Sequence, residues 1–322
     1  MSAESLARSV PPSPRPSFIG IGTGKAGTTW LWGMLRQHPE IFLPSEKELH
    51  YFDEEWYGPP GLRNERADRP LAWYLAHFEE AGPDQLCGEI TPSYLWNPTA
   101  AELLNQFDPD LKLFAILRDP TERVFSSFQF SLLKGEIEQM PFEQALTEHP
   151  YLVERTRYGQ FLDRYLDHFP PDQLAIRFYD DLRSDPRAFL IDIESYLGVS
   201  SFVPDDVDER QNVTVAHAYP RLNRAMMLAR MGLKRHGLER FKDRADRVGL
   251  TRPLKWLQGQ VRPFDETPRM RPETEQELRQ GFVPDIERVE ALTGRDLAAW
   301  KPTARLSGDQ FTGGIGKAER PA

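Results

Sequence analysis

A lysine and two threonines lie among closely spaced glycines in the segment GTGKAGTT, residues 22–29. A glycine turn that leads into a helix presents free backbone N–H groups and the positive end of the helix dipole, which together bind anions. The lysine supplies the charge that a magnesium ion would otherwise provide. The segment therefore predicts a metal-free site for a 5′ phosphate group, formed by Lys25, Ala26, Gly27, Thr28 and Thr29. The ordinary alternative is a tight β–α turn with a solvated lysine.

Two better-known phosphate motifs fit this segment poorly. A Walker A loop has four residues between its glycines and a metal-binding Ser or Thr after its lysine. Here three residues separate Gly20 from Gly24, and Ala26 follows the lysine. The dinucleotide fingerprint GxGxxG is formally matched by residues 22–27 and leaves a nicotinamide-dependent oxidoreductase as an alternative. It would need an acidic residue at the end of the next strand, and the sequence that follows is short and turns polar.

Three short apolar runs, SFIGIG (17–22), KLFAILR (112–118) and QLAIRFY (173–179), are typical of buried strands. Longer segments with helical periodicity separate them, so the sequence predicts an α/β fold with a central, mainly parallel sheet flanked by helices. Ligands of such sheets bind at the carboxyl ends of the strands. Arg118 ends the second run and Ser126 lies two turns into the following helix, so both are candidates for binding a second phosphate.

The combination of two segments is more specific than either alone. TGKAGTTWLWGMLRQHP (23–39) followed by LRDPTERVFSSF (117–128) resembles the two nucleotide signatures of the sulfotransferase family that uses 3′-phosphoadenosine 5′-phosphosulfate (PAPS). The resemblance continues through KELHYFD (47–53), GEITPSYL (88–95) and TPRMRPET (267–274), and looks closest to the carbohydrate branch that includes the heparan sulfate enzymes. It implies a P-loop nucleotide-kinase-like sulfotransferase fold over residues 17–302.

The resemblance also implies roles for residues. The first signature would hold the 5′ phosphosulfate, and Arg118 and Ser126 the 3′ phosphate. In KELHYFD, Glu48 is our first choice for the general base and His50 is the alternative base or the partner that orients Glu48. Asp53, which ends that motif, ranks lower as a support of the pocket. A solvated carboxylate and a histidine packed on aromatic rings are the ordinary alternatives.

Three further positions bear on binding of the nucleotide and of the acceptor. In TPRMRPET, Arg269 and Arg271 match a late basic loop that closes over the nucleotide in the family, although two exposed arginines before a helix are an equal alternative. Some sugar-modifying members carry a lysine where this chain has Ile90.

The reaction that the resemblance implies is transfer of a sulfuryl group from PAPS to a hydroxyl, ahead of an amine, of a carbohydrate, glycolipid-like or small-molecule acceptor. No metal is predicted.

Composition narrows the class of protein. The 322 residues carry a formal net charge of −9, which argues against a nucleic-acid-binding protein. The chain has one cysteine, no apolar core of a signal peptide, and no apolar run near the length of about 20 residues that spans a bilayer. We therefore expect a cytoplasmic location. A non-catalytic nucleotide-binding adaptor that keeps the fold remains the alternative from another class.

Three segments are predicted to lie outside the regular core. Residues 1–16 and 303–322 are expected to be a disordered arm and a flexible tail. Residues 221–262 are rich in Lys and Arg with interleaved Leu, Met and Trp. This segment predicts a basic helical insertion that either packs on the core or makes peripheral contact with an anionic membrane or acidic acceptor.

Overall fold

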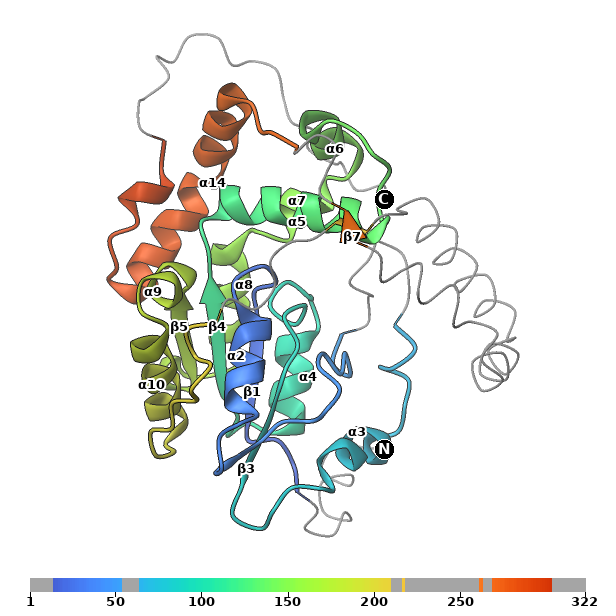
Figure 1. Ribbon diagram of the computed structural model, residues 1–322, viewed down its shortest axis with the longest axis vertical. Helices are drawn as coiled ribbons and strands as arrows, with labels where there is room; N and C mark the ends of the chain where they lie inside the picture. Colours follow the sequence, from blue (N-terminus) through green and yellow to red (C-terminus); the bar gives the residue numbers. More distant parts are fainter. Residues whose placement is uncertain (1–13, 54–63, 210–215, 218–260, 263–267, 303–322) are drawn as a thin grey trace, which may run out of the picture.

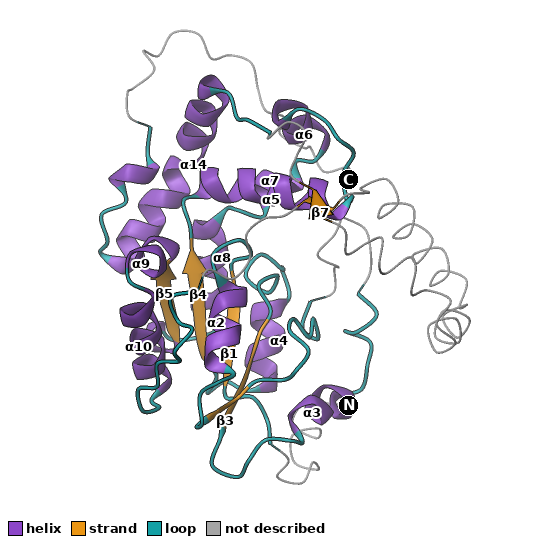
Figure 2. Ribbon diagram, in the orientation of Figure 1, coloured by secondary structure: helices purple, strands orange, loops and turns teal. Residues whose placement is uncertain are grey.

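A five-stranded parallel sheet forms the centre of the molecule, in the order β2-β3-β1-β4-β5 (Figures 1 and 2). The computed structural model describes residues 14–53, 64–209, 216–217, 261–262 and 268–302. The strands of the sheet are β1 (Phe18–Gly22), β2 (Ile41–Phe42), β3 (Leu86–Ile90), β4 (Lys112–Leu117) and β5 (Leu174–Phe178). The α/β class with a parallel sheet is confirmed.

Helices cover both faces and one end of this sheet. They are α2 (Thr28–Leu35), α3 (Leu71–Leu75), α4 (Ala100–Phe107), α5 (Pro120–Lys134), α6 (Phe142–Glu148), α7 (Tyr151–Glu154), α8 (Tyr158–Leu166), α9 (Tyr179–Ser184), α10 (Pro186–Leu197) and α14 (Pro272–Thr293). Two of these helices have clear end signals: the Asp119 carboxylate accepts from two backbone N–H groups at the start of α5, the Asp185 carboxylate accepts from one at the start of α10, and Gly198 ends α10 with φ 86°. Among the described helices, none combines the length and apolar character of a bilayer span.

The central strands are buried on both sides because their side chains alternate between two apolar cores. In β4, Phe114 and Ile116 join one core, which α2 and α10 complete. Leu113, Ala115 and Leu117 join the other core, which is built with α4, α5, α8 and α14. Burial on both faces explains why β4 reads as a continuous apolar run.

Strand β3 was not predicted, because its sequence LCGEI mixes apolar residues with a glycine and a glutamate. The glycine is required here. A Cβ on Gly88 would lie 2.3 Å from the ring of Phe18 on the neighbouring strand β1. Close packing of the two strands therefore replaces the β-branched side chains that usually identify a strand.

The sheet brings three connecting segments to one edge. All strands point the same way, so the segments that follow β1, β3 and β4 lie together at their carboxyl ends. Figure 1 shows α5 running across the end to which the β4 arrow points. The segment after β3 is tied to β1 by the backbone N–H groups of Thr91 and Leu95, which donate to Gly20 and Ile21 at 2.9 and 2.8 Å.

The predicted outer segments fall largely beyond the described ranges. Residues 1–13, 218–260 and 303–322 are not described, so most of the predicted arm, the basic insertion and the tail lie outside them. Two short strands form an antiparallel pair: β6 (Ala216–His217) precedes the basic segment and β7 (Val261–Arg262) ends it. These domain boundaries stay predictions.

Candidate active site

The turn after β1 leaves the N-terminus of α2 open to an anion. Gly27 precedes the helix in the left-handed region, with φ 85°, and makes no side-chain cap. The first turn of α2 contains no acidic residue, so nothing there offsets the positive helix end. A Cβ on Gly27 would lie 2.3 Å from Cδ2 of Leu182, so glycine is required by both conformation and space. Ala26 and Thr28 are buried in this turn, and Thr29 is half-buried.

Lys25 places a partly buried ammonium group beside this turn. Its Nζ lies 4.1 Å from the centroid of the Phe130 ring on α5. Burial, followed by the positive charges of Arg118 and Lys134, lowers the pKa of Lys25 to about 8. Cations that lie close together in this way favour the binding of an anion.

Arg118 joins the two predicted phosphate sites. Its Nη1 donates to the backbone carbonyl of Lys25 at 3.1 Å, and its guanidinium stacks on the ring of Tyr179 at 5.0 Å. Its Nε and Nη2 donate to Oε2 of Glu122 at 3.1 and 2.9 Å. Ser126 lies half-buried on α5, two turns after the helix begins. The structure therefore brings the first and second signatures together, as the sequence predicts.

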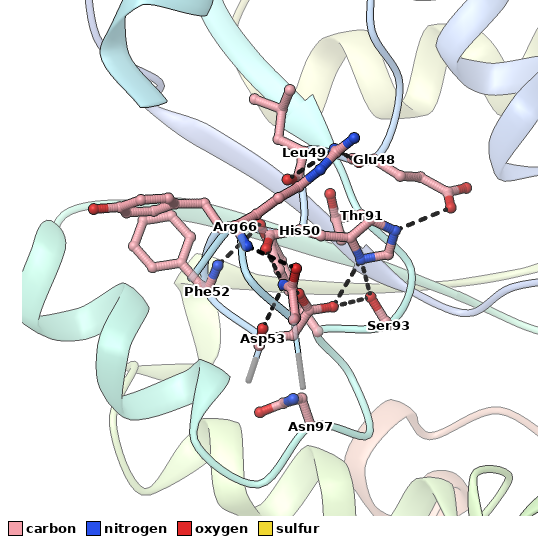
Figure 3. Close-up of polar contacts among 12 residues, drawn as sticks. Glu48, Leu49, His50, Phe52, Asp53, Arg66, Thr91, Ser93 and Asn97 are labelled. Atoms are coloured by element: carbon pink, nitrogen blue, oxygen red, sulfur yellow. Dashed lines mark hydrogen bonds and ion pairs between the residues drawn. The ribbon is translucent and has the colours of Figure 1, made fainter. Parts of the chain in front are cut away.

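A chain of polar side chains lies in the segment that follows β2. Figure 3 shows the imidazole of His50 between the carboxylate of Glu48 and the pair formed by Asp53 and Ser93. His50 Nδ1 lies 2.9 Å from Oδ2 of Asp53, and Nε2 lies 3.6 Å from Oε2 of Glu48. Ser93, which follows β3, donates from Oγ to Asp53. Two predicted residues, Glu48 and His50, thus belong to one network that Asp53 completes.

Opposite charges stabilise each other within this network. Burial alone would raise the pKa of the Glu48 carboxyl, but the hydrogen bond to His50 and the ammonium of Lys47 outweigh it and lower the pKa to about 2. Burial alone would lower the pKa of His50, but the hydrogen bonds to Asp53 and Glu48 raise it to about 9. Around neutral pH the network therefore contains an ionised Glu48 and an imidazolium.

The backbone of this segment is held in an unusual conformation. Glu48 and His50 have φ of 64° and 54°, the left-handed region that non-glycine residues rarely adopt. Arg66 Nη1 donates to the carbonyls of Glu48 and Leu49, both at 3.2 Å, and Asn64 Nδ2 donates to the carbonyl of Asp53 at 2.6 Å. Such conformations persist only where neighbouring groups enforce them, and they concentrate at functional sites.

Glu89 is buried too deeply to act as the base. Its side chain is 2% exposed and accepts hydrogen bonds from Tyr74 at 2.7 Å, Thr91 at 2.7 Å and Tyr94 at 3.1 Å. Burial raises the pKa of its carboxyl. Tyr94 Oη in turn accepts from the backbone N–H of Tyr51 at 3.0 Å. Glu89 therefore braces the segment that holds His50.

The late basic residues are not joined to the phosphate turn. Arg271 precedes α14, and its Nε lies 3.5 Å from Oε1 of Glu143 on α6. Arg269 is exposed, and within the described ranges neither arginine contacts Lys25 or Arg118. Their binding to the nucleotide stays a prediction.

Sequence reasoning missed a residue at the phosphate turn, as it missed Ser93 and Lys47 beside His50 and Glu48. Arg123 on α5 is 2% exposed and donates from Nε to the carbonyl of Gly24 at 3.4 Å. Its signal was its place in LRDPTERVFSSF, five residues after Arg118, but that spacing alone does not show that the side chain reaches the phosphate turn.

The comparison with protein families decides what this constellation is. A family model described as "Sulfotransferase domain" matches residues 15–219, which include the turn, the Glu48–His50 segment and α5. The chain belongs to the sulfotransferase domain family.

Individual relatives agree with this assignment. "Membrane-associated sulfotransferase kil1" of Dictyostelium discoideum is 35% identical over 162 residues, 48% of this chain and 32% of that protein. "Heparan sulfate glucosamine 3-O-sulfotransferase 3B1" of Mus musculus is 27% identical over 260 residues, 78% of this chain and 61% of that protein. The match spans less than two thirds of either relative's length. The crystal structure of a sulfotransferase from Alicyclobacillus acidocaldarius is 26% identical, with a TM-score of 0.63 over 89% of this chain and 99% of that one.

Proposed function

We propose that this sulfotransferase-family chain moves a sulfuryl group from PAPS to a hydroxyl, ahead of an amine, of a carbohydrate or glycolipid-like acceptor. The observation that carries the proposal is the contact between the two phosphate sites, where Arg118 Nη1 donates to the carbonyl of Lys25. A donor with phosphates at both its 5′ and 3′ positions needs two adjacent anion sites, and the contact between Arg118 and Lys25 supports such an arrangement.

The residues present fit such a donor. The uncapped N-terminus of α2 and the ammonium of Lys25 form one anion site, and Arg118 with Ser126 forms the other. When bound, PAPS would supply an activated sulfuryl group and a phosphate leaving group. A nicotinamide dinucleotide fits less well, because β2 is only Ile41–Phe42 and is followed by Leu43 and Pro44 instead of an acidic residue.

Glu48 would act as the base. It accepts the proton of the acceptor hydroxyl while the hydroxyl oxygen bonds to sulfur and the bond from sulfur to the phosphate oxygen breaks. Lys25 and the backbone N–H groups of α2 stabilise the charge that grows on the departing phosphate. His50 keeps Glu48 oriented through Nε2, and Asp53 holds His50 in turn.

His50 and Lys47 set how strong a base Glu48 can be. The hydrogen bond to His50 and the paired ammonium of Lys47 keep the carboxyl pKa at about 2. A general base is most effective when its pKa is near the working pH. Displacement of Lys47 from the Glu48 carboxylate by the acceptor hydroxyl would therefore raise the basicity of that carboxylate.

One position of the site argues against a highly anionic polysaccharide as the acceptor. Relatives named for heparan sulfate support a carbohydrate. Here, however, Ile90 is 1% exposed and belongs to the apolar core, so this position gives no positive charge to a sulfated chain. An uncharged sugar or glycolipid headgroup is the favoured acceptor class.

A transfer assay tests this function and the base together. The full chain is incubated with PAPS and neutral oligosaccharides, glycolipids or heparan sulfate fragments, and sulfated products are detected by mass spectrometry. Glu48→Gln should lower the turnover by about two to four powers of ten, while the exposed control Glu80→Gln should not change it. Unchanged turnover in Glu48→Gln would remove the base assignment, and donor binding without transfer to any acceptor would favour the non-catalytic adaptor.

The basic segment 221–262 is a candidate for contact with an anionic membrane. One relative is named as membrane-associated, which supports a peripheral membrane contact for this segment. The full chain should sediment with anionic vesicles and not with neutral ones. Equal binding to both, or to neither, would contradict the membrane contact.

A further inference from the structure

A buried arginine lies directly behind the phosphate turn. Arg123 is in the first turns of α5, and its side chain, 2% exposed, is the largest among the fully buried ones. Its Nε donates to the carbonyl of Gly24 at 3.4 Å, and its Nη1 donates to Oγ1 of Thr156 at 2.5 Å. Thr156 is itself fixed, because its hydroxyl donates to the carbonyl of Leu152 at 3.1 Å. The guanidinium thus ties the turn after β1 to the junction between α7 and α8.

The charge of this group has no counter-ion in the described part of the chain. Both of its partners are neutral oxygen atoms, and no described carboxylate forms an ion pair with it. Burying a charge without an opposite charge costs free energy, because the low-dielectric interior does not replace the lost hydration. A neutral side chain that donates to Gly24 and Thr156 would tie the same segments without that cost.

The position of the charge indicates what offsets this cost. Arg123 is one of four cations around the phosphate turn, with Lys25 on the turn itself, Arg118 donating to the Lys25 carbonyl, and Lys134 at the end of α5. The positive charge of Arg123 acts electrostatically on the turn, since it is one of the charges that lower the pKa of Lys25. Glu122 offsets the charge of Arg118, and Glu136 acts on Lys25. No described carboxylate pairs with Arg123, so an anion bound at the turn would lower the repulsion among these cations.

We propose that Arg123 is a positioning residue for the donor nucleotide: it holds the phosphate turn through Gly24 and supplies a buried positive charge that becomes compensated when the donor's phosphate groups bind. This inference rests on the proposed function, since it requires a polyanionic donor. Arg123 does not touch the donor, because its side chain is enclosed by protein. It acts through the backbone of the turn and through its electric field.

A purely structural tie between α5 and the phosphate turn predicts a different behaviour. Loss of such a structural contact lowers the stability of the fold and weakens the binding of all ligands of the turn by a similar factor. Loss of a buried charge weakens each ligand in proportion to the number of phosphate groups it carries. The two accounts therefore differ in how the loss of affinity changes from one nucleotide to another.

Calorimetric binding to the full chain separates these accounts. The two probes are 3′-phosphoadenosine 5′-phosphate (PAP), with two phosphate groups, and adenosine 5′-phosphate, with one. The variants are Arg123→Gln, which removes the charge, and Arg123→Lys, which retains it. Arg164→Gln is the matched control, because Arg164 also donates to a main-chain carbonyl, that of Asn97 at 2.9 Å, away from the phosphate turn.

We expect Arg123→Gln to weaken PAP binding at least about tenfold and to weaken adenosine 5′-phosphate binding less. Arg123→Lys and Arg164→Gln should each bind PAP within about threefold of the parent. Equal losses for the two nucleotides, or PAP binding by Arg123→Gln within threefold of the parent, would overturn the proposal. If Arg123→Gln does not fold, Arg123→Lys decides: a tenfold loss with a normal melting temperature would overturn it, and retained affinity would support it.

The outcomes also separate this inference from the proposed function. A parent protein that does not bind PAP would contradict the proposed donor. A parent protein that binds PAP, together with an Arg123→Gln variant that binds it equally well, would contradict the role of Arg123 and leave the donor assignment intact.

Discussion

Replacing His50 tests the charge arrangement of the candidate base. His50 is buried between Asp53 and Glu48, and its pKa rises from 6.5 to about 9. A group whose pKa is raised on folding contributes stability that is fully present below its unfolded value and is lost as the pH rises through its folded value. A rise of this size corresponds to about 3 kcal/mol. This contribution should therefore be complete below pH 6.5 and nearly absent above pH 9.

The measurement is the free energy of unfolding in urea for the parent and for His50→Gln, at pH 6 and at pH 9.5. The difference between the two proteins isolates His50, because other titrating groups contribute equally to both. Lys25 is one of these: its pKa is lowered to about 8, so its contribution to stability increases with pH in the opposite sense. The stability advantage of the parent should shrink by about 3 kcal/mol between the two pH values.

A stability difference that stays constant with pH would refute this reasoning. It would mean that His50 is neutral in the folded protein, so that the carboxylates of Asp53 and Glu48 do not stabilise an imidazolium. The assignment of Glu48 as an ionised base oriented by a charged histidine would then fail, although the fold would be unaffected.

Three further predictions concern the phosphate sites. PAP affinity should fall as the pH rises through about 8, because the Lys25 ammonium is lost there, and calorimetry of Lys25→Arg should show no such fall. Gly27→Ala should lower the unfolding free energy by about 1–3 kcal/mol in urea titrations, because φ is 85° and the new Cβ would press on Leu182; an unchanged value would contradict the required glycine. Glu122→Gln should tighten PAP binding about two- to fivefold, because it removes the carboxylate that Nε and Nη2 of Arg118 contact; weaker binding would show that Glu122 orients Arg118 instead.

The elements of the fold were predictable where one physical signal dominated. Strands β1, β4 and β5 are apolar because both faces of the sheet are covered, and Asp119 and Asp185 identify the starts of helices because their side chains satisfy free N–H groups. Strand β3 escaped prediction because its glycine accommodates the ring of Phe18, a contact between segments about seventy residues apart. Tertiary packing of this kind leaves no local pattern.

The candidate site was predictable to a similar extent. The rule that parallel strands end at one edge explains why Arg118 lies against Lys25, and the motif KELHYFD contains all three members of the Glu48–His50–Asp53 network. The contribution of Ser93 depends on the neighbouring strand β3. Such distant partners follow only from the three-dimensional arrangement.

Calorimetric binding of PAP is the decisive test of the two phosphate sites. The titrations, without added metal, compare PAP with ATP and NAD, for the parent protein and for Arg118→Ala. We expect tight, metal-independent binding of PAP that Arg118→Ala weakens by more than about tenfold, or about 1.4 kcal/mol. A preference for NAD, a requirement of ATP and magnesium, or no binding of PAP would contradict the assignment of the two phosphate sites and the sulfuryl-transfer mechanism built on them.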